Sequence, residues 1–155
     1  DVLREHGYLR ARAIGLPVVY LPESAVERVS GSLFVMPMHT MDNEAHRWDA
    51  AKYADFVESI RPRFSTVVVC IHPSCRRKGY WCPEFEKRGF RIMDGVEYTN
   101  SNGLYRLQKL FQSFEFVTTN GLGSHIFYSA YFGAKPSISG PFAECHPEDF
   151  KDTVL

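Results

Sequence analysis

Residues 116–128 carry the most chemically suggestive pattern of the sequence: a short apolar run, a polar turn, and a helical stretch that opens on glycines. Gly121 and Gly123 have no Cβ, so a ligand can approach the backbone closely there. Amide groups at the start of a helix and the helix dipole attract anions such as phosphates. Small polar side chains of the same turn can add hydrogen bonds, namely Thr118, Thr119, Asn120 and Ser124. We therefore predict an anion-binding turn, although a capped helix packed closely on a strand explains the same residues without a ligand.

A histidine follows the most apolar run of the sequence. His72 comes directly after Val67–Ile71 and precedes Pro73. A histidine at a strand end can donate a hydrogen bond to a phosphate or a ribose, or act as an acid or a base near neutral pH. It can equally bond the backbone and have no ligand. The basic run Arg76–Lys78 either reaches a diphosphate or forms a solvated helix face.

Two further residues are weaker candidates for catalysis. His39 and Asp42 lie in the polar segment 38–44, after the apolar run Ser32–Met36. In a two-domain enzyme this segment would face the cleft between the domains, and Asp42 could act as a base or bind a hydroxyl group. A polar loop in which Asp42 caps the next helix explains the same residues. His125 either points into the cleft or packs inside the domain.

These candidates lie at the ends of predicted strands. Apolar runs and turn residues predict strands that alternate with helices. The strands are 32–36, 67–71, 90–93, 115–119 and 135–139, and the helices are 45–60, 74–88, 101–113 and 121–132. The fold class is therefore α/β, a Rossmann-like three-layer domain with a mostly parallel sheet and helices on both faces. Ligands of such sheets bind beyond the carboxyl ends of the strands, where His39, His72, the turn 118–120 and Ser139 are predicted to lie.

The first thirty residues form a separate segment in this interpretation. Helical character over residues 1–14 ends at Gly15 and Pro17, and Val18–Leu21 is predicted as a short strand. We interpret residues 1–30 as an amino-terminal helix and strand segment, the tail of a preceding region. Residues 31–155 are the predicted Rossmann-like domain.

Bulk composition limits the function classes. The chain has 155 residues, 45% of them apolar, and its 18 basic and 18 acidic side chains balance. A neutral chain argues against a nucleic-acid-binding protein, which usually has a basic face, and no apolar run is long enough for a membrane span. The four cysteines include no C-x-x-C pair, so we predict no metal site and reduced cysteines in a cytoplasmic protein. The motifs of P-loop NTPases, of dinucleotide dehydrogenases and of G-x-S-x-G hydrolases are absent from the sequence.

Two segments carry a resemblance to a known family. Thr118–Tyr128 and Gly133–Gly140 resemble the strand–turn–helix–strand unit with which GT-B type glycosyltransferases hold a sugar nucleotide. The likeness is to bacterial enzymes that build capsular and other surface polysaccharides. His72-Pro73 also resembles the His-Pro pair of bacterial GT-B sialyltransferases. Over most of residues 32–142 the chain is similar to the carboxyl-terminal half of such an enzyme.

The resemblance implies a function and a set of residues. The domain would bind a nucleotide-activated sugar as the donor for transfer to a glycan, with no tightly bound cofactor. His72 would bind the nucleotide phosphate, and the other residues of the site would be Thr118, Thr119, Asn120, Gly121, Gly123, Ser124, His125 and Ser139. Because a GT-B enzyme has two Rossmann-like domains, a second domain, another chain or a homo-oligomer would complete the active site. A sugar-nucleotide epimerase and a non-catalytic α/β interaction module are the alternative interpretations.

Overall fold

A five-stranded parallel sheet is the centre of the structure, a computed structural model that describes residues 2–40, 47–144 and 146. The strands lie in the order β3-β2-β1-β4-β5, and every neighbouring pair is parallel. Their bounds are β1 Val29–Val35, β2 Thr66–Ile71, β3 Arg91–Asp94, β4 Phe114–Thr119 and β5 Lys135–Ile138. The predicted fold class, a Rossmann-like α/β domain, is confirmed.

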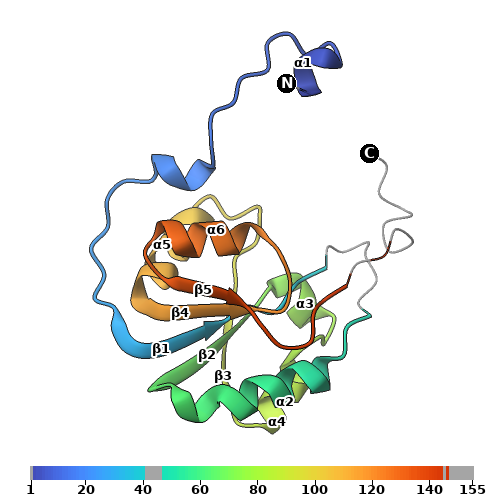
Figure 1. Cartoon of the computed structure of the whole chain (residues 1–155), viewed down its shortest axis with the longest axis vertical. Coiled ribbons are helices and arrows are strands. Elements are labelled where there is room, and N and C mark those ends of the chain that lie inside the picture. Colours follow the sequence, from blue (N-terminus) through green and yellow to red (C-terminus); the bar gives the residue numbers. More distant parts are fainter. Residues whose placement is uncertain (1, 41–46, 145, 147–155) are drawn as a thin grey trace.

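The central strands are apolar on both sides, which requires a layer of helices on each face. In β1, Leu33 and Val35 face one hydrophobic cluster, and Phe34 faces the other. In β2, Val69 faces the first cluster and Val68 faces the second. The sheet is therefore the middle of three layers (Figure 1).

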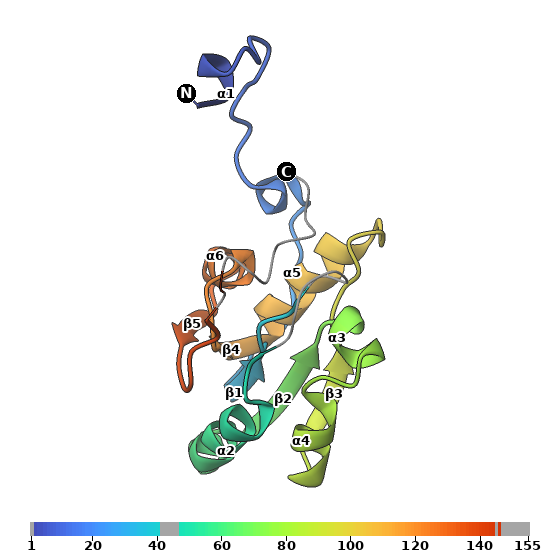
Figure 2. The same ribbon diagram turned by 90° about the vertical axis from the view of Figure 1, so that its right-hand side faces the viewer.

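The helices of the first half of the domain cover one face of the sheet and those of the second half cover the other (Figure 2). The first face carries α2, Ala50–Ile60, and α4, Cys82–Lys87, with the short α3, Pro73–Arg77, at the end of β2. The second face carries α5, Gly103–Ser113, and α6, Ser124–Tyr131. After β3 the chain crosses to the other face of the sheet and enters β4 on the far side of β1. From β1 the strands therefore continue to β2 and β3 in one direction, and from β4 to β5 in the opposite direction. That reversal is the position at which sheets of this kind bind ligands.

The secondary structure predicted for the amino-terminal segment was wrong. The helix expected over residues 1–14 is reduced to α1, Val2–Glu5, and the strand expected over Val18–Leu21 is a 3-10 turn, Pro17–Tyr20 (η1). No residue of α1 is buried, and a helix of one turn is unstable without packing. Residues 2–16 extend away from the domain in both views (Figures 1 and 2).

Helix boundaries also differ from the prediction. The helix expected over residues 74–88 is divided into α3 and α4, because Gly79 and Trp81 both have positive φ angles, +74° and +69°. The helix expected from residue 121 begins at Ser124, and the one expected from residue 101 begins at Gly103. A second 3-10 turn, Arg61–Arg63 (η2), follows α2. None of the helices in the described part of the chain is long and apolar enough to cross a bilayer.

Arg28, the residue directly before β1, binds the carboxyl ends of α5 and α6. Its guanidinium donates to the carbonyl oxygens of Gln112, Phe132 and Gly133, over 3.1, 2.7 and 2.6 Å. Gly133 has a φ of +82° and ends α6, as its sequence position predicts. A cation at the carboxyl ends of two helices also offsets the negative ends of their dipoles.

We expect Arg28→Ala to lower the free energy of unfolding by about 1 kcal/mol, because helix-end carbonyls lose a charged donor. Chemical denaturation would measure the change. Arg10→Ala, in the extended arm, is the matched control and should leave the midpoint unchanged. Equal stability of Arg28→Ala and the wild type would contradict this account of the helix ends.

Candidate functional site

A pocket of about 300 Å³ lies at the carboxyl edge of the sheet, on the side of α5 and α6. Four connections of the chain contribute to it: the segments that follow β1, β2 and β3, and the start of α6. Its lining residues are Met36, Pro37, His39, Cys70, His72, Gly95, Val96, Glu97, Tyr98, Asn100, Gly103, Leu104, Leu107, Ser124, His125 and Tyr128. The pocket therefore spans the β1–β4 reversal, where the fold predicts a ligand.

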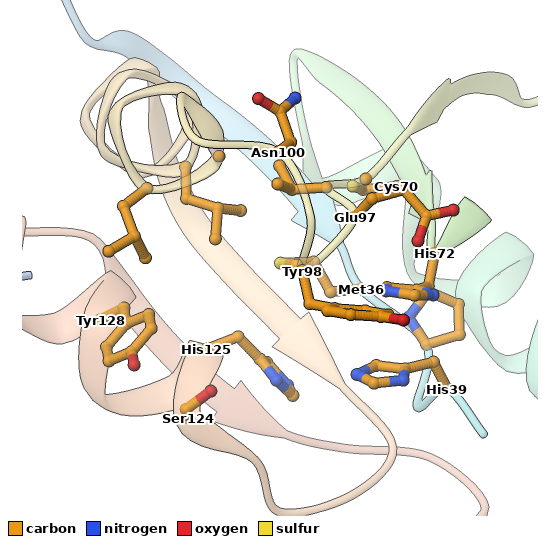
Figure 3. A pocket seen from close by; sticks show the side chains of 16 residues that line it. Met36, His39, Cys70, His72, Glu97, Tyr98, Asn100, Ser124, His125 and Tyr128 are labelled. Atoms are coloured by element: carbon orange, nitrogen blue, oxygen red, sulfur yellow. The ribbon is translucent and has the colours of Figure 1, made fainter. Parts of the chain in front are cut away.

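Three histidines from different elements meet in this pocket. His39 follows β1, His72 follows β2, and His125 lies in the first turn of α6. The rings of His39 and His72 stack, with centroids 4.2 Å apart and planes inclined by 17°. Figure 3 shows His125 on the opposite wall, with its ring directed toward the other two. The pocket thus offers several nitrogen donors or acceptors without a fixed charge.

Burial sets the charge of His125. Removal of its ring from water and, to a smaller extent, the nearby charge of His39 together lower the pKa of His125 to about 4. Its Nε2 atom is buried and has no hydrogen-bond partner within the described residues. His125 is therefore a neutral imidazole at pH 7. A side chain at Gly123 would displace it, since an added Cβ would lie 2.7 Å from the Cε1 atom of His125.

The segment after β1 is fixed by hydrogen bonds to the backbone N–H and C=O groups of Met38. The amide of Met38 donates to Asn120 Oδ1 over 2.9 Å, and the carbonyl of Met38 accepts from Trp81 Nε1 over 2.9 Å. Trp81 is 1% exposed and has a positive φ, which is strained for a large side chain. Gly121 leaves room for Met38, because a Cβ there would lie 2.5 Å from the Met38 Cγ. These contacts place His39 beside His72.

The segment after β3 supplies a wall that the sequence interpretation missed. Glu97, Tyr98 and Asn100 line the pocket, and the Tyr98 ring reaches toward His72 and His39 while 81% exposed (Figure 3). Arg77 of α3 pairs with Glu97 and lowers the pKa of its carboxyl. β3 was predicted as a strand of the same parallel sheet, so its carboxyl end could have been expected at this edge.

The two arginines of the basic run, Arg76 and Arg77 of α3, form ion pairs in the structure. Arg76 pairs with Asp94 over 2.9 Å, and Arg77 with Glu97. No lysine or arginine is among the described residues that line the pocket. Cys70 lines its floor, and burial raises the pKa of this thiol to about 12, so it is not a thiolate at neutral pH.

Not all residues predicted for the site reach the pocket. His39, His72, Ser124 and His125 line it. Asn120 and Gly121 lie behind it and hold the segment after β1. Thr119 is fully buried, and its hydroxyl has no partner within the described part of the chain.

Thr118 and Ser139 lie outside the lining of the pocket. Their hydroxyl oxygens are 2.9 Å apart, and Ser137 Oγ lies 3.1 Å from each. Thr118 is beside Tyr53 of α2, and Gly140 is against Phe56 of the same helix, so this cluster faces the other layer. Asp42 lies outside the described residues.

No group of three or more His, Cys, Asp or Glu side chains in the described ranges is placed to hold a metal ion. Comparisons with protein-family models, with curated proteins and with solved structures gave no match. The fold and the geometry of the pocket are therefore the observations on which a function has to be argued.

We expect the stability of the protein to depend on the charge of His125. A histidine of the unfolded chain has a pKa near 6.5, whereas that of the folded His125 is about 4. The folded state therefore keeps its full stability above pH 6.5. As the pH falls from 6.5 to about 4, the unfolded chain gains a proton that the folded His125 does not, and the free energy of unfolding decreases by on the order of 2–3 kcal/mol. Denaturation curves between pH 4 and 7.5 would measure it.

His125→Gln is the control for this pH dependence, since other groups titrate in the same range. The difference in unfolding free energy between wild type and variant should shrink as the pH falls. A difference that stays constant over the range would contradict the buried neutral state of His125.

Proposed function

We propose that this domain binds a nucleotide-activated sugar in the pocket and belongs to an enzyme that transfers the sugar to a glycan, in surface-polysaccharide biosynthesis. One observation carries the proposal: His72 and the adjacent pair Ser124 and His125, which come from distant parts of the sequence, line one pocket at the β1–β4 reversal. That is where parallel α/β domains bind nucleotides. The likeness of Thr118–Tyr128 and Gly133–Gly140 to GT-B glycosyltransferases supports the same ligand.

The start of α6 and His72 would hold the phosphate. No side chain caps this helix at Gly123, so its first amide N–H groups can donate hydrogen bonds to an anionic ligand. His72 and the exposed Ser124 add donors on either side. The same groups would stabilise the negative charge of the phosphate as it leaves the sugar.

The apolar part of the pocket suits a nucleobase. Leu104 and Leu107 of α5, together with Tyr128 of α6, form one wall. A volume of about 300 Å³ is at the lower end of the range for small-molecule sites. It would hold a nucleoside phosphate, and the sugar would extend outward to the acceptor.

The carboxylate among the described residues of the pocket is poorly suited to act as a general base. This carboxylate is that of Glu97, and its pKa is lowered because Arg77 hydrogen-bonds it. A general base works best when its pKa lies near the working pH. Under this proposal the base comes from a second domain or another chain.

We expect a nucleotide-sugar of the correct base to raise the midpoint of thermal unfolding, since a ligand that binds the folded state stabilises it. A thermal-shift screen with CMP-, UDP- and GDP-sugars would identify the base, and calorimetry would give the affinity. No response to any of them at millimolar concentration would contradict the proposal.

Gly123→Val tests the position of the ligand. The valine side chain would displace the ring of His125 and fill the start of α6, so we expect an affinity at least 10-fold weaker, about 1.4 kcal/mol. Gly123 has φ −160°, which any residue adopts, so the domain should stay folded. Arg63→Ala, at the opposite edge of the sheet, is the control and should bind as the wild type does. Unchanged affinity of Gly123→Val would place the ligand elsewhere.

A partner-binding role is the second candidate, and a different observation favours it. The arm of residues 2–20 exposes several large apolar side chains: Val2, Leu3, Tyr8, Leu9, Ile14, Leu16, Val19 and Tyr20. An apolar surface of this extent is typical of an interface. A negative nucleotide screen together with self-association that is lost on removal of residues 1–20 would favour this role.

A further inference from the structure

Ser74 touches both the ring of His72 and the segment after β1. It lies in the first turn of α3 and is 4% exposed. Its amide donates to His72 Nδ1 over 3.2 Å, and its Oγ lies 2.6 Å from the same nitrogen. Its hydroxyl also donates to the carbonyl oxygen of Thr40 over 3.0 Å. Ser74 is therefore the link between a pocket histidine and the backbone beside His39.

The contact with the Ser74 amide favours one tautomer of His72. The Ser74 hydroxyl has a single hydrogen, which it can donate either to Nδ1 or to the Thr40 carbonyl oxygen. An amide N–H can only donate, so Nδ1 accepts from Ser74 and carries no proton while the ring is neutral. The single proton of the neutral ring is then on Nε2.

The same serine also accommodates the protonated ring. The new proton on Nδ1 can be donated to Ser74 Oγ, which lies 2.6 Å away. Ser74 Oγ can donate its own hydrogen to the Thr40 carbonyl oxygen in this state, whereas the Ser74 amide no longer has Nδ1 as an acceptor. Nε2 therefore carries a proton in both charge states of His72.

We propose that Ser74 is a positioning residue, which holds His72 by Nδ1 so that an Nε2–H donor faces the pocket whether the ring is neutral or charged. The stack on His39 keeps the plane of the ring (Figure 3). The inference rests on the proposed function in one respect: the group that Nε2–H would bind is a phosphate oxygen of the donor nucleotide. The orientation itself is a property of the protein without ligand.

Several groups around His72 influence its charge. They are His39 after β1, Glu97 and Tyr98 after β3, Arg77 of α3, which pairs with Glu97, and His125 across the pocket. A variant at Ser74 alters none of these side chains chemically, so a change in the titration of His72 reports on the hydrogen bonds of the serine.

The first experiment uses the unmodified protein. Nitrogen-15 NMR of histidine-labelled protein near pH 8 should show the proton of His72 on Nε2, with Nδ1 as a hydrogen-bonded acceptor. A proton on Nδ1 would overturn the proposal. This measurement requires neither a ligand nor a variant.

The second experiment compares Ser74→Ala with Ser129→Ala. Ser129 is also fully buried, and its hydroxyl donates to a backbone carbonyl, that of Ile126, so its loss removes a similar bond. In Ser74→Ala the charged ring loses its acceptor, and we expect the titration midpoint of His72 to fall by about 1 pH unit. Ser129→Ala should leave that midpoint unchanged. Equal midpoints in wild type and Ser74→Ala would overturn the proposal.

Nucleotide affinity separates this inference from the proposed function. If a nucleotide-sugar binds the wild type, Ser74→Ala should weaken it roughly 3- to 10-fold at pH 7, and lower pH should recover part of the loss. An affinity of Ser74→Ala equal to that of wild type would overturn the positioning role. If no nucleotide binds the wild type, the proposed function fails, and the NMR measurements alone decide the orientation of His72.

Discussion

The pocket depends on one residue, Met38, whose backbone N–H and C=O groups are both held by side chains. Met38 donates to the side chain of Asn120 at the end of β4, and it accepts from the indole of Trp81, which precedes α4. These two bonds tie the segment after β1 to elements on either side of it. Because Trp81 has a positive φ and is almost fully buried, the surrounding aromatic cluster has to hold its strained backbone in place. The position of His39, and with it the shape of the pocket, follows from this clamp.

The two layers of helices give the carboxyl edge of the sheet two different surfaces. On the side of α5 and α6, histidines and apolar side chains line a pocket. On the side of α2, the hydroxyls of Thr118, Ser137 and Ser139 bond mainly one another. A ligand on the first surface meets histidine and hydroxyl groups and a helix amino end, since the arginines of α3 are paired with Asp94 and Glu97. An enzyme built on this surface would rely on oriented hydrogen bonds more than on fixed positive charge.

The histidines differ in what surrounds them, and their chemistry differs accordingly. His125 is buried, which keeps it neutral. His72 is bound at Nδ1 by Ser74, which leaves its other nitrogen as the donor. Sequence spacing identified both residues as candidates but gave no indication of these states. The contribution of Ser74 was also missed, because a serine in a short helix has no distinctive pattern until its neighbours are known.

The sequence by itself determined the layers of this protein. Continuous apolar runs at Leu33–Val35 and Val67–Ile71 require burial on both faces, and alternation with helical segments then requires a parallel sheet. It also placed His39 and His72 at the carboxyl edge of the sheet, because the carboxyl ends of parallel strands coincide. Only the tertiary structure decided which face of that edge each side chain meets. Thr118 and Thr119 are adjacent, yet strand geometry turns them to opposite layers. The wall from β3 and the clamp on Met38 depend likewise on contacts between segments twenty or more residues apart, which no local pattern contains.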